Sequence, residues 1–170
     1  LLVLGHLGPS DAPATHVRRR TRGQVRIEQL GLDELEPLAQ LFDAYRCWYG
    51  QEPDAPGARS FLRQRMEAAE SVLFGAYEAD ELVAFTQLYP SFSSVSMGFT
   101  WILNDLYVVE TRRGAGYGRA LMEAARKHAS TTGAIRLDLA TAHTNQTAQR
   151  LYEGLGYVMD ADFRHYSLTV

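Results

Sequence analysis

The most distinctive stretch of the sequence is a turn in which three glycines alternate with other residues, Arg112-Arg113-Gly114-Ala115-Gly116-Tyr117-Gly118-Arg119. A long aromatic and β-branched stretch precedes it, and helical spacing follows at once. Glycines at a strand-to-helix turn let the backbone approach a ligand closely, and the helix N-terminus adds partial positive charge. Because Arg113 and Arg119 add full charges, the turn suits a phosphate or pyrophosphate. The alternative is a turn that only packs the helix on the sheet.

Two common phosphate-binding motifs do not fit this turn. A dinucleotide-binding fingerprint requires a third glycine where Arg119 stands, and an acid at the end of the next strand, whereas Asp138 lies within one. A P-loop requires Gly-Lys-Ser/Thr, and the only lysine, Lys127, lies inside the predicted helix. The spacing that remains is R-x-x-G-x-G, formed by Arg113, Gly116 and Gly118.

Together with two flanking stretches, this spacing resembles the GNAT superfamily of N-acetyltransferases. The flanking stretches are Leu-Asn-Asp-Leu-Tyr-Val at residues 103–108 and a motif at residues 145–157, in which Asn145 precedes Tyr152 by seven residues and the end reads Leu-Gly-Tyr. The resemblance spans residues 25–170. It implies an enzyme that moves an acetyl group directly to a primary amine of a small molecule, peptide or protein. Its cofactor would be acetyl-CoA, which leaves as coenzyme A.

The resemblance also implies which residues hold coenzyme A. The backbone of Leu106, Tyr107 and Val108 would pair with pantetheine, and one N–H would stabilise the acetyl oxygen. The glycine turn would take the pyrophosphate, and Asn145 would anchor the pantetheine arm. The full expected set is Leu106, Tyr107, Val108, Arg113, Gly114, Ala115, Gly116, Tyr117, Gly118, Arg119, Asn145, Ala148 and Tyr152.

Two residues are candidates for catalysis. Tyr152 lies one helical turn after Ala148, and its phenol is a suitable proton donor to a leaving thiolate. On spacing alone, Tyr152 also fits the apolar stripe as a core aromatic. Asp105 is the candidate general base, with a structural carboxyl as the alternative. Polyamine acetyltransferases that resemble this chain carry Glu-Asp where it has Asn104-Asp105, which argues against a polyamine acceptor.

The acceptor and the activity each leave an alternative open. Carboxylates in the expected acceptor loops, Glu52, Asp54, Asp160 and Asp162, favour a cationic acceptor by steering, or are solvated loop charges. A catalytically silent acyl-CoA-binding or regulatory domain of the same fold is the alternative function. The presence of both Asn145 and Tyr152 favours the enzyme.

Composition narrows the class of protein. The 170 residues are 46% hydrophobic and 22% charged, as in an ordinary domain with its own core. The single cysteine, Cys47, excludes an internal disulfide and a zinc cage, so we expect no metal. No apolar run approaches the ~20 residues of a membrane span. We therefore expect a soluble, cytoplasmic protein with no membrane partner, and the resemblance makes a homodimer plausible.

Charge is distributed unevenly along the chain. Residues 1–22 carry four arginines and one aspartate, for a net charge of +3, and the remainder carries −6. An acidic body argues against nucleic acid as a partner. We expect residues 1–22 to be an extension that is either foreign to the natural chain or mobile, and residues 23–170 to form a single GNAT-like domain.

Periodicity predicts an α+β, three-layer fold with a mixed, mostly antiparallel sheet flanked by helices and a central βαβ unit that binds coenzyme A. The predicted strands are residues 24–29, 71–78, 82–88, 99–109, 135–139, 157–159 and 163–170. The predicted helices are residues 33–49, with Asp33 as the cap, and residues 58–69, 119–131 and 148–155. A loop is predicted at residues 50–57, and a loop or frayed strand end at residues 90–98.

Overall fold

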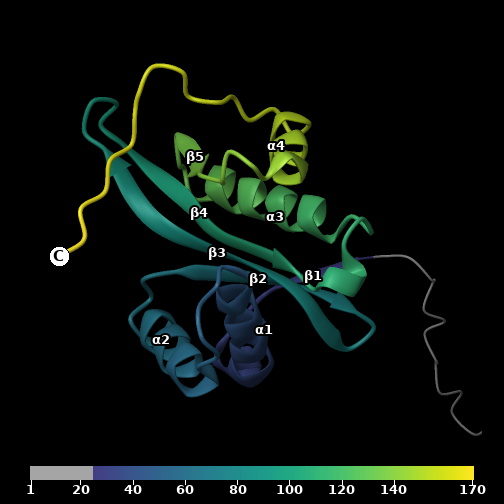
Figure 1. Ribbon diagram of the computed structural model, residues 1–170. Helices are drawn as coiled ribbons and strands as arrows, with labels where there is room; N and C mark the ends of the chain where they lie inside the picture. Colours follow the sequence, from purple (N-terminus) through teal and green to yellow (C-terminus); the bar gives the residue numbers. More distant parts are fainter. Residues whose placement is uncertain (1–24) are drawn as a thin grey trace, which may run out of the picture.

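A five-stranded sheet with helices on both faces organises the structure, a computed structural model that describes residues 25–170 (Figure 1). The strands are β1 (Arg26–Gln29), β2 (Val72–Glu78), β3 (Glu81–Ser93), β4 (Gly98–Val108) and β5 (Arg136–Leu139). The helices are α1 (Leu35–Trp48), α2 (Ala55–Glu67), α3 (Tyr117–Thr131) and α4 (Gln146–Glu153). The predicted extension at residues 1–22 lies outside the described residues.

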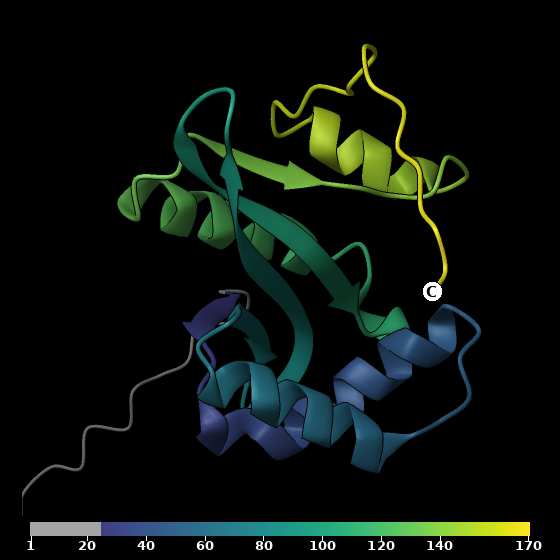
Figure 2. The same ribbon diagram turned by 90° about the vertical axis from the view of Figure 1, so that its left-hand side faces the viewer.

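The sheet is mixed, with the strands in the order β1-β2-β3-β4-β5. The first four strands pair antiparallel, and β4 pairs parallel with β5 through the crossover helix α3. Helices α1 and α2 cover one face, and α3 and α4 lie on the other (Figures 1 and 2). This arrangement confirms the mostly antiparallel sheet and the central βαβ unit predicted from the sequence.

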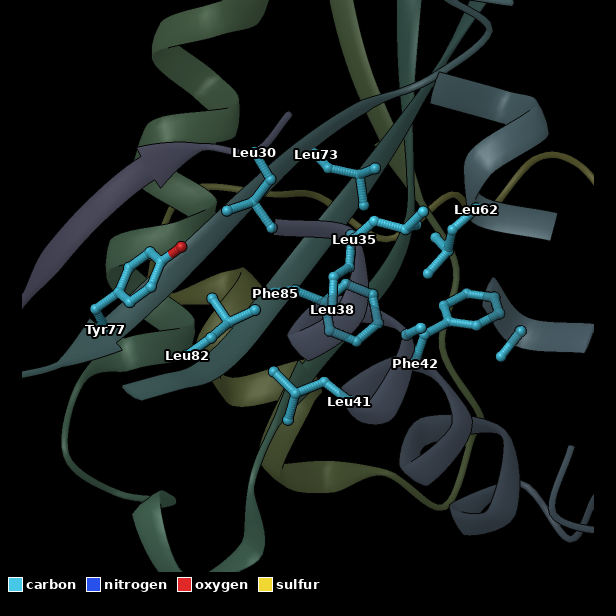
Figure 3. Close-up of a cluster of buried hydrophobic side chains, with 12 residues drawn as sticks. Leu30, Leu35, Leu38, Leu41, Phe42, Leu62, Leu73, Tyr77, Leu82 and Phe85 are labelled. Atoms are coloured by element: carbon cyan, nitrogen blue, oxygen red, sulfur yellow. The ribbon is translucent and has the colours of Figure 1, made fainter. Parts of the chain in front are cut away.

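Each face of the sheet buries its own apolar cluster. Under α1 and α2, Phe85 of β3 is fully buried among leucines that include Leu38 and Leu62 (Figure 3). Under α3, Leu121 and Met122 are buried against the opposite face. Burial of large apolar side chains is the main favourable term in folding, so these two layers hold the sheet between them.

Three predicted boundaries are wrong for local reasons. Helix α2 begins at Ala55 rather than at residue 58, because the Asp54 side chain accepts a hydrogen bond from the Gly57 backbone N–H at 2.9 Å. The cap predicted at Asp33 is absent, since residues 32–34 form a 3-10 turn in which the Glu34 carboxylate accepts the Gly31 N–H. Residues 90–98, predicted as a loop or a frayed strand end, are mostly regular strand, because β3 and β4 pair out to Ser93 and Gly98 and leave only residues 94–97 as the turn.

The two strands predicted at the C-terminus are also wrong. No strand forms after Gly156, and Phe163, Tyr166 and Leu168 are exposed, Phe163 to 74%. The Asp160 carboxylate instead accepts the backbone N–H groups of residues 162 and 163, which makes a local turn. The segment has a strand-like pattern, but among the described residues it has neither a hydrogen-bonded neighbour nor a face to bury.

Candidate active site

A cleft of about 540 Å³ opens where β4 parts from β5. The two strands pair only over Thr100–Leu103 and Arg136–Leu139, and β4 then continues to Val108. The register of β4 against β3 shifts at this point, so that Asn104 has no partner on β3. Such a bulge bends a strand and increases its twist. The end of β4 therefore turns away from β5 and leaves space between them.

On the cleft side no strand among the described residues pairs with β4 over Leu106, Tyr107 and Val108, and the one bond to this free edge is that from Arg113 to the Val108 carbonyl. These residues pair with β3 on one side, opposite Thr86, Phe85 and Ala84 in turn. Backbone groups of an extended strand alternate between its two edges, so those not directed at β3 are directed at the cleft. All three residues line the cleft. A ligand with amide groups can add to such an edge as a neighbouring strand does.

The structure brings together nearly all the residues that the sequence predicted for cofactor binding. The cleft is lined by Leu106, Tyr107, Val108, Arg113, Gly114, Gly116, Tyr117, Gly118, Arg119, Asn145, Ala148 and Tyr152. Two predicted site residues, Ala115 and Asp105, do not line it. The far wall comes from residues 140 and 141 after β5 and from α4.

The glycine turn leads directly into α3. Gly116 is the N-cap residue with a φ of +90°, and Gly114 has a φ of +79°. A Cβ added at either glycine meets no atom within 4 Å, so conformation rather than crowding requires glycine here. Gly118 lies in the first turn of α3, where an added Cβ would contact Leu151 of α4 at 3.4 Å. The turn thus presents an unshielded backbone beside a helix N-terminus, which is an anion-binding arrangement.

The arginines around the turn differ in their partners. Arg112 is paired with Glu78 at 2.6 Å, and the same carboxylate accepts the Tyr117 hydroxyl at 3.2 Å. Arg119 lies 4.0 Å from Glu123, both largely exposed, a separation at which an exposed pair contributes little. Arg113 instead donates from Nε to the Val108 carbonyl at 3.1 Å. The turn therefore has one neutralised guanidinium and two that remain available to an anion.

Asn145 and Tyr152 come from the two ends of α4. Asn145 is the N-cap, and its side-chain oxygen accepts the Ala148 backbone N–H at 3.2 Å. The Tyr152 ring packs on the apolar cluster under α3, while the residue also lines the cleft. The two interpretations of Tyr152, core aromatic and site residue, thus both describe its position.

The environment of Tyr152 keeps its hydroxyl protonated. Burial raises the pKa of Tyr152, and the nearby Tyr49 raises it further. A hydrogen bond with the Thr141 side chain opposes this shift in the pKa. Since the net direction is upward, Tyr152 is a neutral phenol at physiological pH. A neutral phenol can donate a proton to a stronger base such as a thiolate.

Asp105 is buried behind the cleft wall, with 6% of its surface exposed. Burial raises the pKa of the Asp105 carboxyl, and hydrogen bonds from the Asn104 amide, at 3.1 Å, and from Tyr45 act in the opposite direction. Both Asn104 and Tyr45 line the cleft, so each connects the carboxyl to it. Asp105 is therefore one hydrogen bond away from the cleft.

The sequence analysis missed the aromatic residues that α1 contributes. Tyr45, Trp48 and Tyr49 all line the cleft. The Tyr45 and Tyr49 rings meet at 5.1 Å, and those of Trp48 and Tyr49 at 4.8 Å, in edge-to-face contacts. The sequence did contain a sign of them, because the apolar stripe of α1 continues to the end of the helix, past the residues that pack in the core. Trp48, at that end, is 52% exposed.

Two of the carboxylates predicted to steer a cationic acceptor lie elsewhere. Asp54 and Asp160 do not line the cleft, and each accepts hydrogen bonds from the backbone of its own loop.

A comparison with family models decides the classification. The model of the acetyltransferase (GNAT) family matches residues 38–157, which include β4, β5, α3 and α4. The chain belongs to the GNAT acetyltransferase family. This assignment confirms the resemblance inferred from the glycine turn and its two flanking motifs, and it makes the chain an acetyltransferase of a family that generally uses acetyl-CoA.

Named relatives agree with the family assignment. The N-acetyltransferase YhfO of Bacillus subtilis is 46% identical over 146 residues, covering 86% of this chain and 98% of that protein. A probable acetyltransferase of Haemophilus influenzae is 30% identical over 80% of this chain and 92% of its own length. The crystal structure of a probable acetyltransferase matches with a TM-score of 0.81 and 40% identity, covering 85% of this chain and 97% of that one.

Residues 25–170 contain neither a candidate metal centre nor a helix suited to span a membrane. No group of three or more histidine, cysteine, aspartate or glutamate side chains is placed to hold a metal ion. No helix in the same range is long and apolar enough to cross a membrane.

Proposed function

We propose that this cleft transfers the acetyl group of acetyl-CoA directly to a primary amine of a small molecule, peptide or protein. The observation that carries the proposal is that the free edge of β4 and the Tyr152 phenol line one cleft, with the glycine turn at the start of α3 lining it too. An acyl transfer needs a grip on the donor, a polarised carbonyl and a proton for the leaving group, and these three features supply them.

The residues present fit coenzyme A. The unshielded backbone at Gly114 and Gly116, with Arg119 nearby, suits the pyrophosphate. The free edge over Leu106–Val108 suits the amide groups of pantetheine. The carboxamide N–H group of Asn145 is left to bind the pantetheine arm, because only its oxygen is used in the cap. Bound acetyl-CoA supplies the acetyl group as a thioester, whose C–S bond breaks as the C–N bond forms.

The chain's own residues have complementary tasks in this transfer. A backbone N–H on the free edge of β4 stabilises the negative charge that develops on the acetyl oxygen, an effect worth about 3 kcal/mol for one donor. Tyr152 gives its hydroxyl proton to the leaving thiolate and is reprotonated, directly or through water, by the second proton that the nitrogen loses as the amide forms. Asp105 accepts a proton from the acceptor's ammonium group through Tyr45 or water, and its raised pKa makes it a stronger base than a free aspartate.

We also propose the wider setting of this enzyme. Residues 23–170 act as one domain, and acetyl-CoA as the donor supports a cytoplasmic location. A homodimer is supported by the exposed apolar side chains of residues 158–170 together with β5, which ends the sheet among the described residues. Such a contact would cover surface that a single chain leaves in water.

Release of free thiol from acetyl-CoA tests the proposed activity. Purified protein is mixed with acetyl-CoA and a panel of primary amines and lysine-containing peptides, and the thiol is measured against an amine-free control. We expect at least one amine to accelerate release and to appear as its N-acetyl product. If coenzyme A binds and no amine accelerates release, the silent acyl-CoA-binding domain replaces the enzyme. If coenzyme A does not bind, both interpretations are wrong.

A further inference from the structure

The charged side chains that line the cleft are all positive. Among the described residues that line it, Arg112, Arg113 and Arg119 are cationic, and none carries a carboxylate. Glu78 neutralises only Arg112. A cationic amine approaching these arginines without a bound anion is therefore repelled, whereas the aromatic faces on the lining attract a cation.

One cation already lies among these rings. The guanidinium carbon of Arg113 is 5.8 Å from the ring centre of Trp48 and 5.9 Å from that of Tyr107, within the range of cation–π attraction. Trp48 comes from the end of α1 and Tyr107 from the free end of β4, so the two rings approach from different walls. The pair accepts a cation in this structure, and that cation belongs to the chain itself.

The position of Arg113 also conflicts with cofactor binding. Its Nε uses the carbonyl of Val108, which belongs to the free edge that pantetheine is proposed to pair with. Its side chain starts at the glycine turn, where a pyrophosphate would offer it a full negative charge. A guanidinium binds a phosphate more strongly than an aromatic face, because the phosphate contact combines charge and two hydrogen bonds.

We propose that Trp48 and Tyr107 form a subsite for the acceptor's ammonium group, which Arg113 occupies until the pyrophosphate of coenzyme A draws it away. This inference rests on the proposed acetyltransferase function and specifies where the acceptor's ammonium group binds and which side chain occupies that place before coenzyme A is bound. The ammonium group then lies beside Tyr45, whose ring is 6.0 Å from that of Tyr107 and whose hydroxyl reaches the Asp105 carboxylate.

Tetramethylammonium is the probe for this subsite, because it carries the charge of an ammonium group and cannot be acetylated. Its binding is followed by saturation-transfer NMR on its methyl signal, with and without saturating coenzyme A, at constant ionic strength set with sodium chloride. The neutral isostere tert-butanol is the chemical control. We expect wild type to bind tetramethylammonium at least fivefold more tightly with coenzyme A than without, and tert-butanol to show no such dependence.

Variants separate the two parts of the inference. Trp48→Leu should weaken binding of tetramethylammonium about tenfold in the presence of coenzyme A, as expected for loss of one aromatic face. Trp48→Phe should keep most of the affinity. Arg113→Met should bind the probe without coenzyme A as tightly as wild type does with it. Phe92→Leu, an exposed aromatic that does not line the cleft, is the matched control and should behave as wild type.

Each outcome has a defined meaning when thiol release is measured on the same samples. If amines accelerate thiol release but Trp48→Leu binds the probe like wild type, or coenzyme A does not strengthen binding in wild type, the subsite is overturned and the acetyltransferase stands. If coenzyme A binds to none of the samples, both fall. Circular dichroism of Trp48→Leu and its coenzyme A affinity, measured by calorimetry, test whether the variant is folded. If both match wild type, a loss of probe binding is not caused by unfolding.

Discussion

The Tyr45 hydroxyl donates a hydrogen bond to the Asp105 carboxylate, which connects helix α1 to the buried part of β4. Burial raises the pKa of both groups, so the tyrosine stays a neutral donor while the carboxyl binds its proton more tightly than a free aspartate does. This hydrogen bond therefore joins the aromatic side of the cleft to the candidate base.

Replacing Tyr45 by phenylalanine should shift the pH dependence of the reaction. The hydrogen bond favours the charged carboxylate, so its loss raises the pKa of Asp105 further. A base must be deprotonated to act, so the acidic limb of kcat/KM should move to higher pH. The measurement is kcat/KM from pH 5 to pH 9. Tyr77→Phe, a buried tyrosine in the same cluster, is the control. An unmoved limb in Tyr45→Phe would contradict the role of Asp105 as base.

Asp105→Asn should separate stability from activity. The folded carboxyl has a pKa above its unfolded value, so its own contribution to the stability of wild type is greatest below the ordinary pKa near 3.8 and is lost as pH rises through the folded pKa. The asparagine side chain does not ionise, so the variant does not lose stability at this position as pH rises. Its free energy of unfolding should exceed that of wild type at pH 8 and match it at pH 4, while turnover falls about a hundredfold or more.

Urea unfolding at the two pH values, with turnover at pH 8, checks this prediction. Two results would count against it: equal stability of the variant and wild type at pH 8, or full turnover in the variant. In the second case Asp105 is a structural carboxyl, the alternative that the sequence left open.

Tyr152→Phe should lower turnover about a hundredfold, the lower end of what a positioned general acid contributes. The ring and its packing on the apolar cluster remain, so coenzyme A affinity and the melting temperature should change little. The readouts are kcat with a saturating amine and calorimetric binding of coenzyme A. Thr141→Val is the companion variant, because it removes the hydrogen bond that lowers the pKa of Tyr152 and leaves the phenol in place. Undiminished turnover in Tyr152→Phe at every pH excludes the proton-donor role.

The glycine turn and the α4 motif were predictable because their chemistry is local. The spacing of Arg113, Gly116 and Gly118 follows from a strand that ends, a turn with positive φ and a helix that begins, all within a few residues. Asn145 and Tyr152 likewise belong to one short helix. In such segments, a residue's neighbours along the chain are also its neighbours in space.

The remaining features depend on contacts between distant parts of the chain. The bulge at Asn104 is a mismatch between two paired strands, which one strand's pattern does not reveal. Trp48 joins the site only because α1 packs across the sheet toward the end of β4, about sixty residues later in the sequence. The C-terminal segment shows the converse, since residues 163–170 have a strand-like pattern but pair with no strand among the described residues.

Gly116→Val should abolish coenzyme A binding in the calorimeter. A φ of +90° costs a residue with a Cβ roughly 1–2 kcal/mol, and the added side chain points into the open space where the pyrophosphate is proposed to lie. Gly133→Val is a matched control, because Gly133 follows the other end of α3 with a φ of +73° and equally open surroundings. Both variants should lose similar stability, and only Gly116→Val should lose coenzyme A. Intact binding in Gly116→Val would make the turn merely structural.

Asn145 has two proposed tasks, and two substitutions separate them. Its oxygen caps α4, and its amide N–H group is proposed to hold the pantetheine arm. Asn145→Ala removes both and should cost about 1 kcal/mol of stability. Asn145→Ser keeps a capping oxygen without the amide, so its stability should match wild type while coenzyme A binds about tenfold more weakly, as in the alanine variant. Urea unfolding and calorimetry give the two readouts. If the serine variant binds coenzyme A like wild type, Asn145 acts only as the cap that positions α4, and the pantetheine arm has a different partner on this wall.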